Sequence, residues 1–119
     1  MDLSLREKKC VPCEGGIPPM PLAEAQKYLR QLKEKWELVT DEDPVRKDVP
    51  AKKIRHEFKF KYFKEAMAFV NRVAELAERE GHHPDIHIFY NKVMIELWTH
   101  AIMGLSENDF IMAAKIENL

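Results

Sequence analysis

The sequence of 119 residues has little of what marks several common classes of protein. No apolar run approaches the ~20 residues that a membrane-spanning helix needs, and the first residues, MDLSLREKK, lack the pattern of a signal peptide. The net charge is only -1, so the composition gives no sign of a nucleic-acid partner or an anionic membrane surface. We therefore expect a cytoplasmic protein whose length allows one domain with a single core.

Cysteine is also scarce, because the chain has only Cys10 and Cys13. A structural zinc site needs four ligands, and no second cysteine pair exists. A thioredoxin-like pair follows a strand and opens a helix, whereas this pair lies in a loop with Gly15 and Gly16. We expect ordinary thiols, with a redox-sensitive pair and half of a metal site as the less favoured alternatives, and we expect no metal or cofactor.

The hydrophobic pattern predicts three helices and four strands in the order helix, strand, strand, helix, strand, strand, helix. Spacings of three and four predict helices at 22–35, at 63–80 and from Ser106 onward. Alternation and short apolar runs predict strands at 36–39, 54–60, 86–90 and 93–99. This order predicts an α+β fold, a four-stranded antiparallel sheet with helices packed on one face. We expect this fold to be a single domain at 22–119, preceded by an irregular arm at 1–21.

Apolar residues cover a wider part of the expected second helix than one buried face needs. Its main stripe consists of Phe63, Ala66, Met67, Val70, Ala74 and Ala77. A second set, Phe69, Val73 and Leu76, lies off that stripe and either widens the core face or contacts another subunit. The second alternative predicts a homo-dimer or a larger assembly.

Three of the five histidines fall in one spaced pattern, Glu78-x3-His82-His83-Pro84-x5-Tyr90-x9-His100-x8-Asp109. Histidine gives and takes protons near neutral pH. Two adjacent histidines and a third brought back by the fold indicate a pocket for proton transfer that needs neither a metal nor a covalent nucleophile. A metal site at His82, His83 and His87 is disfavoured, because that run leaves a helix and enters a strand.

This pattern resembles the signature of the pterin-4a-carbinolamine dehydratases. The resemblance extends through Trp36, the Phe58-Lys-Phe60 strand, the turn at 90–93 and the segment 104–110, and it covers about residues 20–119. The cysteine-containing arm is similar to that of bacterial and plant members. The resemblance implies the same fold, dimers or tetramers, and the dehydration of 4a-hydroxytetrahydropterins to quinonoid dihydropterins. That reaction regenerates the cofactor of aromatic amino acid hydroxylases.

Dehydration of such a carbinolamine requires a proton for the hydroxyl that leaves C4a and removal of the proton from N5. Groups that titrate near neutral pH suit both steps. The resemblance implies that His82 and His100 are the acid/base pair and that His83 positions the pterin. Which histidine is the acid and which the base stays open.

The other residues of the pattern have more ordinary alternatives. Glu78 either orients an imidazole or supports the helix face, and we favour support. Trp36 and Trp98 either stack on the pterin or belong to the core. Pro84, Tyr90 and Asp109 are expected to be structural. In this interpretation Pro84 fixes the turn, Tyr90 anchors a hairpin and Asp109 helps to cap the last helix.

Two other functions remain open at this stage. The first is a non-catalytic dimerisation or protein-binding module, a role that the animal form of the family has toward a homeodomain transcription factor. The second is a pterin-binding protein of another pathway. The intact set of three histidines favours the enzyme, and the form of the arm argues against the transcriptional role.

Overall fold

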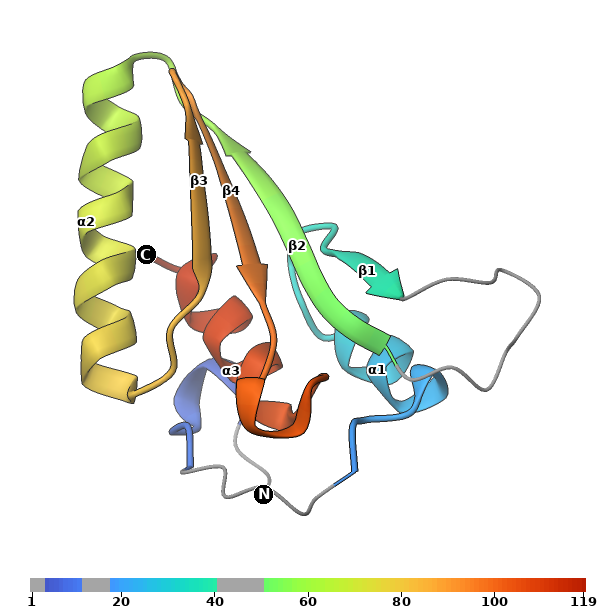
Figure 1. Ribbon diagram of the computed structural model, residues 1–119. Helices are drawn as coiled ribbons and strands as arrows, with labels where there is room; N and C mark the ends of the chain where they lie inside the picture. The colour runs from blue at the N-terminus through green and yellow to red at the C-terminus, as the bar shows by residue number, and fades with distance from the viewer. Residues whose placement is uncertain (1–3, 12–17, 41–50) are drawn as a thin grey trace.

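The computed structural model describes residues 4–11, 18–40 and 51–119. Within them, four antiparallel strands form one sheet in the order β1-β2-β4-β3 (Figure 1). The strands are β1 (Glu37–Thr40), β2 (Ala51–Lys59), β3 (Asp85–Phe89) and β4 (Lys92–Leu97). The helices are α1 (Leu22–Leu29), α2 (Phe63–Glu80) and α3 (Glu107–Ile116), with short 3-10 helices η1 (Leu5–Glu7) and η2 (His100–Ile102). The predicted α+β fold is confirmed.

The centre of the sheet supplies the middle of the core. Val93, Ile95 and Leu97 of β4 are completely buried, and Ile54 of β2 is buried beside them. Successive side chains of a strand point to opposite faces, so Met94 and Glu96 between them point to the other face of the sheet. Both α2 and α3 contact β4 and each other, so the buried face of the sheet is the face that the helices cover (Figure 1). No helix of the described residues combines the length and apolar character that crossing a bilayer requires.

The opposite face of the sheet carries paired charges. Glu96 of β4 contacts the Lys53 ammonium at 2.9 Å and His87 Nε2 at 2.6 Å. Burial raises the pKa of Glu96, but the hydrogen bonds from Lys53 and His87 outweigh burial and hold the pKa of this carboxyl below its usual value. The contacts join β2, β4 and β3 across the sheet.

The helix α2 ends where the sequence predicts. Gly81 follows it with a φ of 68°, a left-handed conformation that glycine adopts without strain. The buried side chains of α2 are Ala66, Phe69, Val73, Leu76 and Ala77.

The burial of α2 corrects one of the alternatives drawn from its sequence. Phe69, Val73 and Leu76 belong to the core of this chain, so their assignment to a subunit contact is wrong. Phe63 of the predicted core stripe is instead 46% exposed. The spacing of apolar residues shows which side chains share a face, but both sets are apolar. The pattern therefore leaves open which face meets the sheet.

The helix α1 ends at Leu29, well before its predicted end. Glu117, just after α3, accepts the backbone N–H of Lys33 at 2.7 Å and that of Glu34 at 3.0 Å. The same carboxylate accepts the indole N–H of Trp36 at 3.0 Å. Because a distant carboxylate binds these backbone amides, the chain turns toward β1 instead of continuing the helix.

The N-terminal arm is less irregular than expected, because it contains η1. Leu5 of η1 is 4% exposed and belongs to the core. The Lys115 ammonium of α3 donates to the carbonyl of Arg6 at 2.9 Å. The arm is therefore packed against α3, and the division of the chain into an arm and a domain stays a prediction.

We predict that Phe69→Ala lowers the free energy of unfolding by about 3–5 kcal/mol, because it leaves a cavity in the core. The Phe69 ring is 5% exposed and lies 4.8 Å from the ring of Phe58 and 5.1 Å from that of Phe60, centroid to centroid. The control is Phe89→Ala on β3, where the side chain is 57% exposed and the expected loss is below about 1 kcal/mol. Urea denaturation compares the two variants, and equal losses would contradict this account of the core.

Candidate active site

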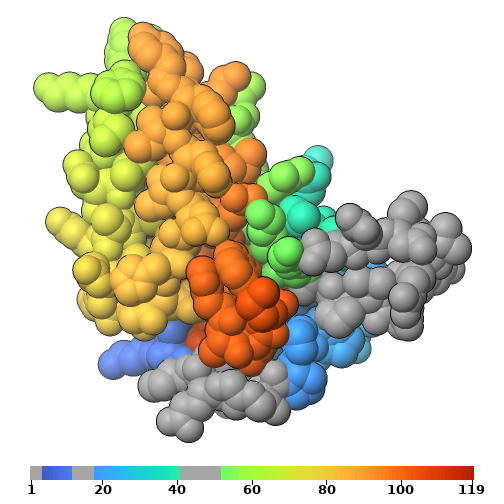
Figure 2. Space-filling model, viewed as in Figure 1, coloured from blue at the N-terminus to red at the C-terminus, as the bar shows by residue number. Residues whose placement is uncertain are grey.

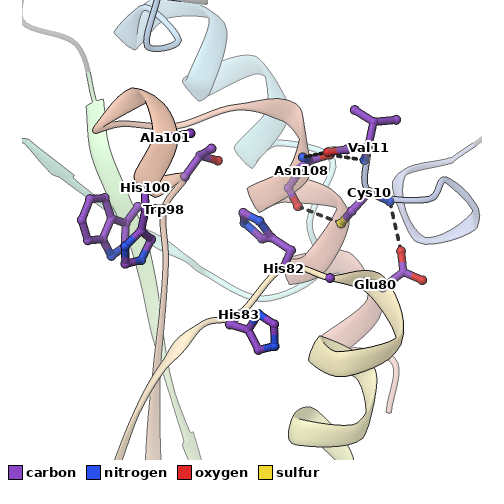
Figure 3. Close-up of a pocket in the computed structure, with 11 residues that line it drawn as sticks. Cys10, Val11, Glu80, His82, His83, Trp98, His100, Ala101 and Asn108 are labelled. Atoms are coloured by element: carbon purple, nitrogen blue, oxygen red, sulfur yellow. Dashed lines mark hydrogen bonds between the residues drawn. The ribbon is translucent and has the colours of Figure 1, made fainter. Parts of the chain in front are cut away.

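A cavity of about 530 Å³ lies where α2, the segment after β4, the start of α3 and the arm come together. Its lining consists of Cys10, Val11, Glu80, Gly81, His82, His83, Trp98, Thr99, His100, Ala101 and Asn108 (Figure 3). On the molecular surface, the segment of η2 (dark orange) lies beside the residues that follow α2 (yellow to light orange) (Figure 2). The fold therefore brings the three histidines of the sequence pattern to one cavity.

The two adjacent histidines after α2 lie in different environments. The backbone N–H groups of Gly81 and His82 both donate to the carbonyl of Ala77, at 2.9 and 3.2 Å, and the chain then leaves the helix. The side chain of His82 is 12% exposed, whereas that of His83 is 61% exposed. His83 Nε2 lies 2.9 Å from a carboxylate oxygen of Glu78, so the glutamate contacts the exposed imidazole and not the buried one.

A completely buried carboxylate holds His82. Asp109 Oδ1 lies 2.6 Å from His82 Nε2. Its other oxygen accepts the backbone N–H of Ser106 at 3.0 Å and the hydroxyl of Thr99 at 2.8 Å. Ser106 and Asp109 form the capping box of α3 that the sequence predicts. The cap residue therefore has a second contact, to a histidine of the cavity.

The contact with Asp109 fixes which nitrogen of His82 can exchange a proton. In a neutral imidazole one nitrogen donates and the other accepts. When Nε2 donates to the carboxylate, Nδ1 is the acceptor, which is how a base is commonly oriented in enzymes. The sequence analysis placed His82 in the proton-transfer pair but missed its contact with Asp109. The two residues are 27 positions apart, and the capping role already accounted for the aspartate.

The third histidine lies just beyond β4. The strand ends at Leu97, earlier than expected, and His100 opens η2. The ring of Trp98 stacks on His100 with 3.8 Å between centroids, and its indole N–H donates to Asp85 at 3.0 Å. The two rings therefore lie on the same side of the chain, as strand alternation predicts. Among the described residues, stacking on Trp98 is the contact that orients this imidazole.

Two other residues of the sequence analysis lie away from the cavity. Trp36 is 5% exposed and packs in the core, 5.9 Å from the Phe58 ring and 5.6 Å from His56. Tyr90 occupies the turn between β3 and β4 with a φ of 54°, and its ring is 6.3 Å from that of Phe63. The structure brings Trp98 to the histidines, but it does not bring Trp36 there.

The arm contributes Cys10 to the cavity, which the sequence analysis did not anticipate. Burial, followed by the negative charges of Glu80 and Asp109, raises the pKa of the Cys10 thiol to about 12. The thiol is therefore neutral at physiological pH. Cys13 lies outside the described residues, so the expectations for the cysteine pair stay predictions. In the described part of the chain, no three His, Cys, Asp or Glu side chains are arranged to hold a metal ion.

We predict that Cys10 of the folded protein reacts slowly with iodoacetamide, tested in a Cys13→Ser background. Because its pKa is raised to about 12, the reactive thiolate is scarce at pH 8 and forms only as the pH rises. Alkylation followed by mass spectrometry should be roughly 10³-fold slower than in urea-unfolded protein, where the pKa returns to about 8.5. Equal rates in the two states would contradict the burial of this thiol.

The chain is similar to proteins of one known family. The family described as pterin 4 alpha carbinolamine dehydratase matches residues 18–119. A protein of Alkaliphilus metalliredigens is 46% identical over 114 residues, which cover 96% of this chain and 94% of the relative. A protein of Halorhodospira halophila is 47% identical over 117 residues, which cover 98% of each. The names of both relatives place them among the pterin-4-alpha-carbinolamine dehydratases.

A solved structure has the same fold. The crystal structure of a protein named transcriptional coactivator/pterin dehydratase, from Brucella melitensis, matches with a TM-score of 0.70 at 33% identity. The match covers 84% of this chain and 96% of that one. Together, the fold and these matches show that the chain belongs to the pterin-4a-carbinolamine dehydratase family, a family of hydro-lyases.

Proposed function

We propose that this protein dehydrates a 4a-hydroxytetrahydropterin to the quinonoid dihydropterin and water, with His82 and His100 as the proton-transfer groups. The observation that carries the proposal is the contact of 2.6 Å between His82 and the buried Asp109, beside a cavity that His100 also lines. The two imidazoles come from different elements, the end of α2 and the start of η2. A substrate in the cavity can therefore meet two proton-transfer groups at once.

The reaction balances without any further reactant. One histidine takes the proton from N5 of the pterin, and the other gives a proton to the hydroxyl at C4a, which leaves as water. The electron pair of the N5–H bond becomes the new double bond between N5 and C4a. Two groups that exchange protons near neutral pH are sufficient for both transfers.

His83 and Glu78 support the proposal as a positioning pair. His83 is largely exposed, and its ring is held 2.9 Å from Glu78. We assign His83 to binding the pterin and Glu78 to orienting the imidazole of His83. Trp98, partly exposed beside His100, supplies flat apolar surface next to the catalytic ring. The regeneration of a hydroxylase cofactor and the cytoplasmic location stay predictions.

We predict that His82→Gln and His100→Gln each lower kcat by about 10²-fold and raise KM much less, because each removes one proton transfer. Glutamine at position 82 keeps an amide donor for Asp109, so the buried carboxylate is not left without that partner. Stopped-flow measurement on a freshly prepared 4a-hydroxytetrahydropterin gives both constants.

The matched controls are His56→Ala and His87→Ala. These imidazoles contact Glu34 and Glu96 and do not line the cavity, so we expect turnover close to that of the unaltered protein. Circular dichroism confirms that each variant is folded. Near-normal kcat in folded His82→Gln and His100→Gln would refute the assignment. Absence of any turnover in the unaltered protein would instead favour a non-catalytic binding module.

We also propose that a second copy of this chain packs on α2. Phe63 and Ala74 are exposed, and Met67 and Val70 between them are partly exposed. Their spacing of four, three and four residues places them in one stripe along the helix. An apolar stripe of this kind is typical of a helix that meets a partner helix. We therefore propose this exposed stripe as the subunit contact, in place of the buried set that the sequence offered as one alternative.

We predict a homo-dimer or homo-tetramer by sedimentation at micromolar concentration, and dissociation of that assembly in Met67→Glu, because a charge cannot be buried unpaired in an apolar contact. The control is Ala68→Glu, which adds the same charge at an exposed position about 100° further around the same helix. A monomer of 14.0 kDa in the unaltered protein would refute the proposal.

A further inference from the structure

The N-terminal arm forms part of the cavity wall. Cys10 and Val11 line the same cavity as His82 and His100 (Figure 3). The family match begins at residue 18, so these two residues lie outside the region that it covers. The histidines of the cavity belong to the matched region, whereas this wall precedes it in the chain.

Asn108 holds the arm in place through the backbone of Val11. The Asn108 side chain accepts the N–H of Val11 at 3.0 Å and donates to its carbonyl at 2.6 Å. An amide side chain that both accepts and donates in this way reproduces the pairing between two strands. Asn108 is 5% exposed, so these bonds are largely shielded from water. The N–H of Cys10 adds a third bond, to Glu80 at 3.0 Å.

The anchor points lie at the helix ends that also hold the catalytic pair. Glu80 is the last residue of α2, two positions before His82, and Asn108 directly precedes Asp109 in the first turn of α3. A displacement of either anchor therefore changes the wall on one side of His82. Figure 3 shows His82 between the arm on one side and the stacked Trp98 and His100 on the other.

The wall is mainly apolar. The three bonds occupy the N–H of Cys10 and both backbone polar groups of Val11. The Cys10 thiol donates to the carbonyl of Asn108 at 3.7 Å, so the Val11 side chain, which is 66% exposed, is the apolar group that this wall presents to a ligand. A surface of this kind suits an aliphatic group and offers little to the polar edge of a pterin ring.

We propose that Asn108 and Glu80 are positioning residues that hold Cys10 and Val11 against the C6 side chain of the pterin, so that the arm sets the preference for that side chain. The inference rests on the proposed function. C6 is bonded to N5, the atom that must lose its proton, so a substituent at C6 begins beside the catalytic histidines. The arm, which adjoins His82, is the apolar surface that such a substituent meets.

The test measures KM and kcat for 4a-hydroxytetrahydropterins that carry a methyl, ethyl or propyl group at C6. In the unaltered protein we expect KM to fall by up to about 4-fold for each added CH₂, because each buries more apolar surface. Asn108→Ala should remove this dependence on chain length, because the wall is displaced, and it should raise KM for the propyl compound more than it lowers kcat. Val11→Ser should weaken the dependence without disturbing the backbone bonds.

Three further variants separate the role in binding from a merely structural one. Glu80→Gln keeps the acceptor for the Cys10 N–H and should retain more of the length dependence than Glu80→Ala. The matched control is Arg6→Ala in the same arm, whose side chain contacts Asn118 away from the cavity. It should show the length dependence of the unaltered protein.

Two outcomes would overturn the proposal. The first is a KM of the unaltered protein that does not depend on chain length, and the second is an unchanged dependence in Val11→Ser. Because Val11 is exposed, this variant remains informative even if Asn108→Ala fails to fold. Absence of turnover with every pterin would overturn the proposed function as well. Turnover with a flat length dependence would overturn only the role of the arm.

Discussion

The buried carboxylate of Asp109 is the constraint on which the rest of the site depends. A charge that is removed from water is tolerated only when hydrogen bonds replace the lost hydration. Asp109 is completely buried and has three such contacts, to Ser106, Thr99 and His82. These partners belong to the start of α3, the segment after β4 and the end of α2. The hydrogen bonds of this one carboxylate therefore fix the relative position of three walls of the cavity.

The two histidines that we propose as the proton-transfer groups are held in different ways. His82 is largely buried and fixed by a hydrogen bond to a carboxylate, whereas His100 is exposed and fixed by stacking on Trp98. A hydrogen bond at Nε2 determines both the orientation and the available nitrogen of the His82 ring. Stacking determines the plane of a ring but leaves both of its nitrogens free to exchange protons. The two imidazoles can thus serve one reaction from unequal environments.

Local patterns in the sequence predicted most of the fold, and contacts between distant residues account for what they missed. The end of α2 at Gly81 and the shared side of Trp98 and His100 follow from helical spacing, glycine conformation and strand alternation. The early end of α1 depends on Glu117, which lies near the other end of the chain. The bond between His82 and Asp109 also joins distant residues, and a pattern of residue types cannot show which of them will meet.

The site lies at the ends of helices and strands. This position explains why its residues both satisfy the backbone there and hold the walls of the cavity. Helix ends leave backbone N–H and C=O groups without partners, so polar side chains collect there to satisfy them. At the start of α3, Asp109 closes the capping box and also binds His82, while Asn108 beside it binds the arm. The first turn of α3 therefore anchors two walls of the cavity, one through Asp109 and the other through Asn108. A substitution of Asp109 must then disturb both the cap and the contact with His82, so stability and the geometry of the site cannot vary independently at that position.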